Sequence, residues 1–225
     1  LVVLAIPEAA ADLIAAVAGW GDGAPVVLAG PDAVYTLPAG SGPVASPAPD
    51  GVVVLGLVAG NGRVWIRTSA GVGRVVADAV TWPGTDGAGD TLGAPLAALT
   101  GPVTAAVEAD GALVVAASDS LKAFALDASG AASGLTWTWP LAGAVAGGVQ
   151  ALAGPQPLLA DTADLVAFGA DGAVALDVLE GGATALDAAL LGADRVPLRG
   201  VRGAAATGDG GVLAGRFEGR LDRRT

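Results

Sequence analysis

The stretch TAAVEADGALVVAASDSLKAFAL, residues 104–126, contains the pattern that decides the fold. Three short segments rich in Ala, Val and Leu are separated by two clusters of turn-forming residues, Asp110-Gly111 and Ser118-Asp119-Ser120. Asp-Gly between short apolar segments is a strong signal for a β-hairpin, because Gly adopts positive φ freely and Asp tolerates it. The stretch therefore predicts three successive antiparallel strands.

The same pattern occurs at four other places along the chain. Each copy has a small-residue segment, a turn, an apolar segment, a second turn and a third segment, and the copies lie at 14–37, 44–66, 149–169 and 203–224. In all but the copy at 149–169, which has Gly154-Pro155, the first turn is Asp-Gly, with its acidic residue at Asp22, Asp50, Asp110 or Asp209. Five copies in 225 residues average about 45 residues each, and a period of about 40–45 residues is typical of four-stranded β-propeller blades.

The third segment of four copies carries one aromatic residue. These residues are Tyr35, Trp65, Phe124 and Phe168. One bulky ring per copy, at a similar distance from the turn, is what packing between adjacent sheets requires. We therefore interpret these rings as core residues.

The repeats predict an all-β protein with a single domain, residues 1–225, folded as a β-propeller of five four-stranded blades. The last copy has only three segments, at 203–208, 211–217 and 219–224, while LVVLAI, residues 1–6, is an unassigned apolar segment. Adding 1–6 as the outer strand of the last blade would close the ring and bury its side chains. Because the repeats are unevenly spaced, a ring of four or six blades is also possible. If the sheets do not form a closed ring, residues 1–6 would pair with a neighbouring chain.

Two local segments leave alternatives, and a third has a single interpretation. Residues 7–19 fit a loop followed by a strand, which we prefer, but also a helix that starts at Pro7. The segment ATALDAALL, 183–191, fits a short helix or a strand, and TWPGTDGAGDTLGAP, 81–95, is interpreted as an extra loop.

Two segments carry a family resemblance. In FALDASGAASGLTW, 124–137, the residues Ala125, Asp127, Gly130 and Trp137 resemble the repeat of the quinoprotein-like (PQQ-repeat) and WD40-like β-propellers. ALDVLEGG, 175–182, repeats the pattern with Ala175, Asp177 and Gly181. The resemblance implies a propeller of the non-catalytic scaffold type found in bacterial envelopes, and it does not imply a quinone cofactor.

The amino-acid composition excludes several kinds of chemistry. The chain has no His, Cys or Met, so Ser-His-Asp sites, disulfides and the usual zinc, copper, haem and iron–sulfur ligand sets are excluded. The acidic loops at 85–90 and 161–164 each offer too few ligands to hold calcium alone. We find no phosphate-binding motif and no apolar segment of transmembrane length, and we expect no cofactor and no metal.

The charge of −11 is distributed unevenly. An acidic chain repels the phosphates of nucleic acid, so we expect no nucleic-acid partner. Most of the basic residues lie near the C-terminus, at Arg195, Arg199, Arg202, Arg216, Arg220, Arg223 and Arg224. We interpret this cluster as a solvated edge or as a surface that binds an acidic partner, with the first five as candidate partner-binding residues.

Trp82 and Trp139, each followed by Pro, are two further candidates. They would bind a peptide or a glycan if exposed, and pack between sheets if buried. Carboxylates are the only plausible acid/base groups, and those of the Asp-Gly turns are the candidates for a glycosidase-like site, although the hairpins already account for them.

The sequence therefore predicts a non-catalytic scaffold that binds other proteins in a larger bacterial envelope or cell-surface assembly. The predicted location is extracytoplasmic, in the periplasm or on the cell surface. The alternative is a carbohydrate-binding or glycoside-cleaving propeller that uses carboxylates at the mouth of its channel.

Overall fold

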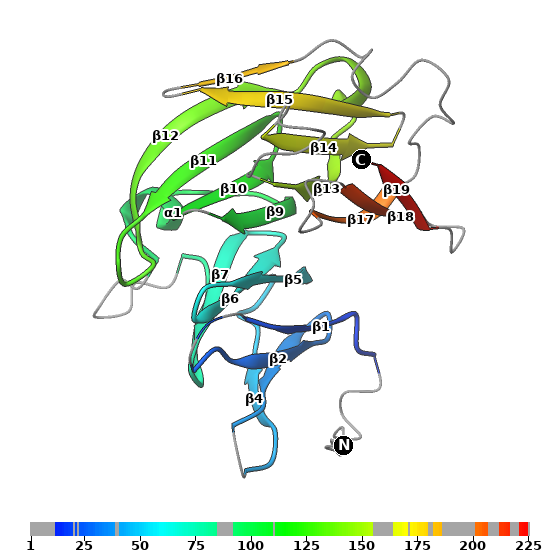
Figure 1. Cartoon of the computed structure of the whole chain (residues 1–225). Helices are drawn as coiled ribbons and strands as arrows, with labels where there is room; N and C mark the ends of the chain where they lie inside the picture. Colours follow the sequence, from blue (N-terminus) through cyan, green and yellow to red (C-terminus); the bar gives the residue numbers. More distant parts are fainter. Residues whose placement is uncertain are drawn as a thin grey trace. The chain divides into compact units, whose positions relative to one another are not determined.

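Figure 1 shows the computed structural model of the chain, in which strands form nearly all of the regular structure. The structure describes residues 12–19, 21, 23–38, 41–84, 92–109, 111–154, 164–170, 172–179, 182–185, 201–206, 212–216 and 221–224. The chain divides into two compact units. Unit 1 comprises residues 1–103 and Ser129–Ala131, and unit 2 comprises 104–128 and 132–225.

Unit 1 contains two four-stranded sheets, each with its strands in chain order. The first consists of β1 (Ala15–Ala18), β2 (Val26–Ala29), β3 (Ala33–Thr36) and β4 (Val44–Pro47). The second consists of β5 (Val54–Gly60), β6 (Arg63–Thr68), β7 (Gly71–Val76) and β8 (Ala79–Thr81), and a single helical turn, α1 (Ala94–Ala97), follows it.

Unit 2 contains two more four-stranded sheets and one of three strands. The first has β9 (Val103–Ala109), β10 (Ala112–Ala117), β11 (Ser120–Leu126) and β12 (Ala132–Pro140), followed by a 3₁₀ turn, η2 (Gly143–Val145). The second has β13 (Val149–Ala153), β14 (Leu165–Gly169), β15 (Ala173–Leu179) and β16 (Gly182–Ala185). The third has β17 (Val201–Ala206), β18 (Val212–Arg216) and β19 (Leu221–Arg224).

Each unit is held together by apolar side chains that point from one sheet toward the next. In unit 1 this cluster includes Val27, Val34, Val64 and Ile66, all fully buried. In unit 2 the corresponding cluster includes Leu121, Leu165 and Leu176. Burial of one such side chain contributes about 1.5–3 kcal/mol, so the short strands depend on this packing.

The all-β prediction is confirmed in its coarser form, because the described part of the chain forms antiparallel sheets of three or four strands, as β-propellers do. Residues 15–18 form a strand rather than a helix, and so do residues 182–185. The segment at 81–95 is not all loop, since it contains the start of α1. LVVLAI, residues 1–6, lies outside the described residues.

The boundaries predicted for two repeats are wrong. The segment at 44–47 is β4, the last strand of the first sheet, and the second sheet begins only at β5. In the copy at 149–169, β13 pairs directly with β14, so 165–169 is a second strand and not a third. Trp65 and Phe168 therefore lie on second strands, whereas Tyr35 and Phe124 lie on third strands. Turn residues indicated where strands end but not which sheet each strand joins.

The Asp50-Gly51 turn illustrates the reason. It connects β4 to β5, two strands of different sheets, and its amide at Val52 donates to the carbonyl of Pro49 at 3.0 Å. Only Gly51 has a positive φ, 78°. This pattern fits a type II turn and not the type I′ turn of a two-residue hairpin.

Candidate interaction surface

The outer strand β12 is the best candidate for a surface that binds another protein. It is the edge of its sheet, it has nine residues, and none of them is charged. Leu135 at its centre is 53% exposed. An uncharged edge strand with an exposed leucine is a favourable contact surface for a partner.

Two β-bulges shape this edge. The register between β11 and β12 shifts at two places, which leaves Thr136 and Ser133 as the extra residues. The hydroxyl of Thr136 donates to the carbonyl of Ala123 at 3.0 Å, and that of Ser133 donates to the carbonyl of Ala125 at 3.2 Å. Bulges bend an edge strand and make continuous strand pairing with another chain harder. We therefore expect side-chain contacts, rather than an added strand, at this edge.

The two faces of β12 have different environments. Trp137 is buried in the core cluster of unit 2, and Trp139 packs against the same cluster while half-buried. Leu135 is paired with Phe124, and Thr138 is paired with Lys122. Because side chains alternate along a strand and Thr136 is an extra residue, Leu135 and Thr138 lie on the face opposite the two tryptophans.

The candidate residues from the sequence fall into three groups. Trp139 lies on β12 but on the face opposite Leu135, where it packs against the core cluster of unit 2, whereas Trp82 is only 8% exposed and lies in the core cluster of unit 1. Arg202 and Arg216 lie on β17 and β18. Three of the arginines lie outside the described residues, namely Arg195, Arg199 and Arg220. Burial of Trp82 agrees with the packing role, which was one of the two alternatives.

Unit 1 contains an arginine–tryptophan cluster on β6 and β7 that sequence reasoning missed. The guanidinium carbons of Arg63 and Arg74 lie 6.0 and 5.9 Å from the ring centroid of Trp65, whose side chain is fully buried. Arg74 is paired directly with Trp65 across the two strands. Arg74 Nη1 also donates to the carbonyl of Ser129 at 3.3 Å, and Arg63 Nε donates to the carbonyl of Asn61 at 2.6 Å.

The same face of β6 carries a third arginine. Arg67 Nη2 donates to the carbonyl of Leu55 at 3.5 Å, and burial lowers the pKa of Arg67 below its ordinary value. Gly56 is paired with Arg67, and a Cβ atom at Gly56 would lie in contact with the guanidinium. The alternation RVWIRT, with arginines two residues before and two after a tryptophan, is the sequence signal that could have indicated this face.

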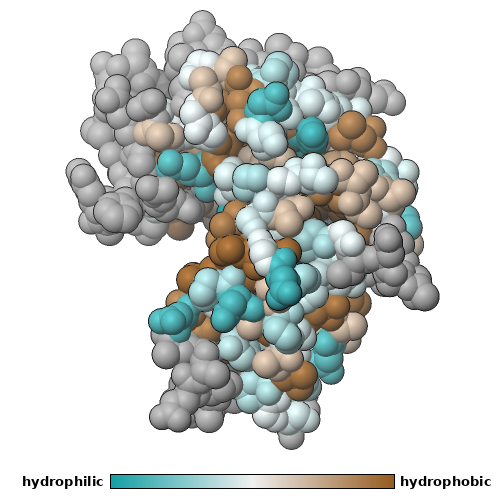
Figure 2. All heavy atoms as spheres, turned by 180° about the vertical axis from the view of Figure 1, so that it is seen from behind, coloured by the Kyte–Doolittle hydropathy of each residue, from teal (hydrophilic) through white to brown (hydrophobic). Residues whose placement is uncertain are grey.

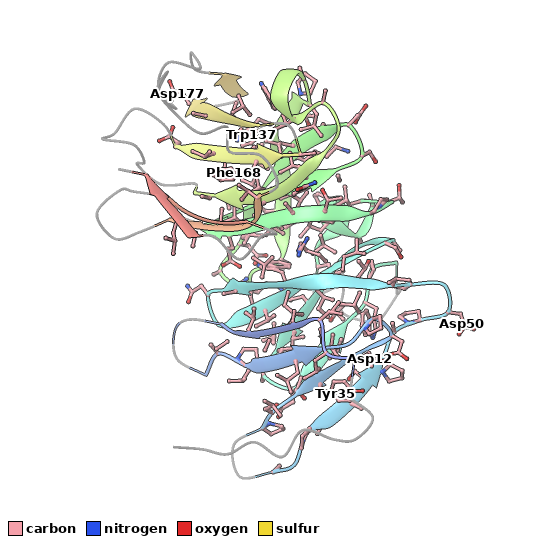
Figure 3. The ribbon with its side chains drawn as sticks, turned by 90° about the vertical axis from the view of Figure 1, so that its right-hand side faces the viewer. Asp12, Tyr35, Asp50, Trp137, Phe168 and Asp177 are labelled. Carbon is pink, nitrogen blue, oxygen red and sulfur yellow. The ribbon has the colours of Figure 1, made fainter. Side chains whose placement is uncertain are left out.

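Unit 2 contains a pair of carboxyl groups, Asp164 and Asp177, of which Figure 3 labels Asp177. Leu165 is paired with Leu176, and the amide of Asp164 donates to the carbonyl of Leu176 at 2.9 Å, so Asp164 lies close to the part of β15 that carries Asp177. Their side chains are hydrogen-bonded to each other. Partial burial raises the pKa of Asp177 above its ordinary value, and the hydrogen bond and negative charge of Asp164 raise it further.

The structure brings together acids that the sequence did not link. Asp164 belongs to the acidic loop 161–164, and Asp177 belongs to the PQQ-like segment. Of the four turn acids proposed for catalysis, Asp50 is exposed in the connection between β4 and β5, and Asp22, Asp110 and Asp209 lie outside the described residues. Only strand pairing could show that Asp164 and Asp177 are neighbours.

The described residues contain no group of three or more acidic side chains that could hold a metal ion. Within that same part of the chain, no helix has the length and apolar character needed to cross a membrane. In the view of Figure 2, apolar and polar residues are interspersed over the described surface.

Comparison with solved structures supports the fold. The chain is similar to virginiamycin B lyase from Staphylococcus aureus, with 12% identity and a TM-score of 0.57 over 94% of this chain and 69% of that one. It is also similar to the Pan2 WD40 domain of Neurospora crassa, with 12% identity and a TM-score of 0.55 over 96% of this chain and 64% of that one. A third similar structure is the extracellular domain of the hybrid two-component system BT4673 of B. thetaiotaomicron, with 10% identity and a TM-score of 0.55 over 95% of this chain and 27% of that one.

These comparisons are consistent with a β-propeller fold. No protein-family model matches the chain, and no curated protein matches it in sequence. One similar structure is a lyase and another is a WD40 domain. At these identities the likeness concerns the fold alone, and function has to be argued from the side chains.

Proposed function

We propose that the protein is a non-catalytic scaffold that binds other proteins through the outer strand β12. The observation that supports this function best is the uncharged edge around Leu135, where an exposed leucine lies on a strand anchored by the buried Trp137. A rigid anchor with an exposed apolar centre is the usual arrangement of a protein-binding surface. WD40-like folds among the similar structures are compatible with such a role.

The test compares two matched substitutions on exposed residues. Leu135→Arg places a charge at the centre of β12, and Val44→Arg places one on β4, where Val44 is 47% exposed. We expect co-purification from the native source, with cross-linking and mass spectrometry, to recover a stoichiometric partner with the wild type and with Val44→Arg. Leu135→Arg should lose that partner. A wild-type protein that purifies alone and monodisperse would contradict the scaffold function.

We also infer a finer form of the fold, in which residues 1–225 form one domain with five blades of the PQQ-like type. The ring would be closed by 1–6 pairing with β19 (Leu221–Arg224), the edge of the three-stranded sheet. Because the chain has no cysteine, engineered pairs report this directly. Val3→Cys is combined in turn with Leu221→Cys, Asp222→Cys or Arg223→Cys. At least one of these pairs should form an intramolecular disulfide, because paired strands bring Cα atoms within the distance that a disulfide spans. Val3→Cys with Thr81→Cys is the control, and failure of all three pairs would exclude this closure.

The proposed location is extracytoplasmic, within a multi-subunit assembly of a bacterial envelope or cell surface. The support is the resemblance of 124–137 and 175–182 to envelope scaffold propellers. Fractionation of the native source should place the protein outside the cytoplasm and in a particle much larger than its 21.4 kDa mass. Recovery as a cytoplasmic monomer would contradict both the proposed location and the proposed assembly.

The alternative function, carbohydrate binding or glycoside cleavage, meets a geometric difficulty in the described carboxyl pair. Asp164 and Asp177 are hydrogen-bonded to each other, whereas the carboxyl pairs of glycosidases are about 5–9.5 Å apart to leave room for the sugar or water. A glycan array with the wild-type protein distinguishes the functions. Specific glycan binding that Leu135→Arg leaves intact would favour the alternative.

A further inference from the structure

We propose that Asp164 and Asp177 form an acid-stabilised clasp between β14 and β15, so that this pair of strands is held more firmly as the pH falls. The proposal goes beyond the scaffold function and does not depend on it. It concerns a conformational response built into one sheet of unit 2.

The hydrogen bond between the two carboxyl groups requires a proton on one of them. The pairing of Leu165 with Leu176 and the bond from the amide of Asp164 to the carbonyl of Leu176 bring the two aspartates close together, and their carboxyl groups share a hydrogen bond. Two carboxylates have only acceptors, so this hydrogen bond exists when one of the two groups is protonated. When both groups are ionised, the bond is lost and two negative charges face each other across the ladder.

Among the described strands and turns that pack against β14 and β15, none carries a titratable side chain. The elements that pack against β14 and β15 are β13 (VQALA), β16 (GATA) and η2 (GAV). On β16, Thr184 is the register partner of Asp177. Because these elements supply no positive charge, the repulsion between the two carboxylates is relieved when one of them is protonated.

The direction of the response follows from linkage. The pKa of Asp177 is raised in the folded protein, so the folded state binds this proton more tightly than the unfolded chain does. The resulting stabilisation is complete below the unfolded-state pKa and disappears as the pH rises through the folded-state pKa. A raised pKa of one unit corresponds to a tenfold change in the equilibrium between folded and unfolded states.

Thermal unfolding from pH 4 to pH 8 tests the clasp with the full chain. Asp177→Asn keeps the size of the side chain, donates an amide hydrogen to Asp164 and removes one charge. We expect this variant to unfold at a higher temperature than the wild type at pH 7.5 and to lose the wild type's gain in stability on acidification. The control is Asp119→Asn in the exposed turn between β10 and β11, which should follow the wild-type curve.

Parallel pH curves for the wild type and Asp177→Asn would overturn the proposal. If Asp177→Asn does not fold, Asp164→Asn provides the same comparison. Carbon NMR of the carboxyl groups in the wild type gives a result that needs no variant. Titration of Asp177 above the ordinary aspartate value of about 3.9 supports the clasp, and titration at or below that value overturns it.

Discussion

The arginine–tryptophan cluster of unit 1 and the carboxyl pair of unit 2 solve the same physical problem in opposite ways. Each brings like-charged groups together on neighbouring strands, since Arg63 and Arg74 flank Trp65 while Asp164 faces Asp177. A guanidinium does not lose its proton at any ordinary pH, so its charge must be met by a ring face and by carbonyl oxygens. A carboxyl group can take up a proton instead.

The comparison indicates that the stability of the two units should depend on different conditions. Arg74 is 4% exposed and held by Trp65 and the carbonyl of Ser129, so its environment is fixed by packing. Asp177 is half-buried, and its pKa is raised by partial burial and by the neighbouring Asp164. We therefore expect unit 1 to be sensitive to changes of shape and unit 2 to changes of pH.

The largest effect should come from Trp65→Ala. This change removes a fully buried side chain and the ring beneath two guanidinium groups, and it should lower the free energy of unfolding by about 3–5 kcal/mol. Trp65→Phe keeps a ring and should cost clearly less. Chemical denaturation followed by circular dichroism measures both, and equal losses would mean that the ring face does not support the arginines.

A smaller effect separates the two arginines. Arg74→Lys loses the planar contact with Trp65 and the geometry of the bond to Ser129, so we expect a loss of about 1–2 kcal/mol. Arg63 is half-exposed, and Arg63→Lys should cost less because water screens the charge. Urea midpoints of the two variants measure the difference. A larger loss from Arg63→Lys would reverse our ranking of the two contacts.

Amide hydrogen exchange should show the contrast within a single sample. After correction for the intrinsic rate, exchange in β14 and β15 should slow on going from pH 7.5 to pH 5, by up to about tenfold for each unit by which the pKa of Asp177 is raised. Exchange in β6 and β7 should stay constant, because arginine does not titrate in this range. Uniform slowing in both units would show that the response is not local to the aspartates.

The smallest effect concerns a backbone position beside the arginine cluster. Ala77, in the turn between β7 and β8, has a positive φ of 50°. Glycine relieves this strain, so Ala77→Gly should raise the free energy of unfolding by up to about 1 kcal/mol. Ala79→Gly in the adjoining strand is the matched control and should lower it by about 0.5–1 kcal/mol. Thermal unfolding of both variants measures the difference, and equal destabilisation by both would mean that Ala77 is not strained.

Much of the fold could be predicted from local patterns. Short apolar segments between turn residues predicted β10, β11 and the three strands of the last sheet close to their observed bounds. The predicted boundaries of the copy at 44–66 were wrong, because Asp50-Gly51 connects two sheets and resembles in sequence the turns within them. Of the candidate residues, Trp139 lies on the proposed strand β12 but faces the core of unit 2, and Trp82 is in the core of unit 1.

By itself, the sequence determined the strand-rich architecture, the absence of His and Cys chemistry and the strongly acidic character, since these follow from residue types and their spacing. Only the tertiary structure decided that Asp177 faces Asp164, that Arg74 lies over Trp65 and that Leu135 is exposed on a bulged edge. The physical reason is that a strand's neighbours are set by register. Register depends on packing across sheets, and a shift of one residue turns every side chain to the other face.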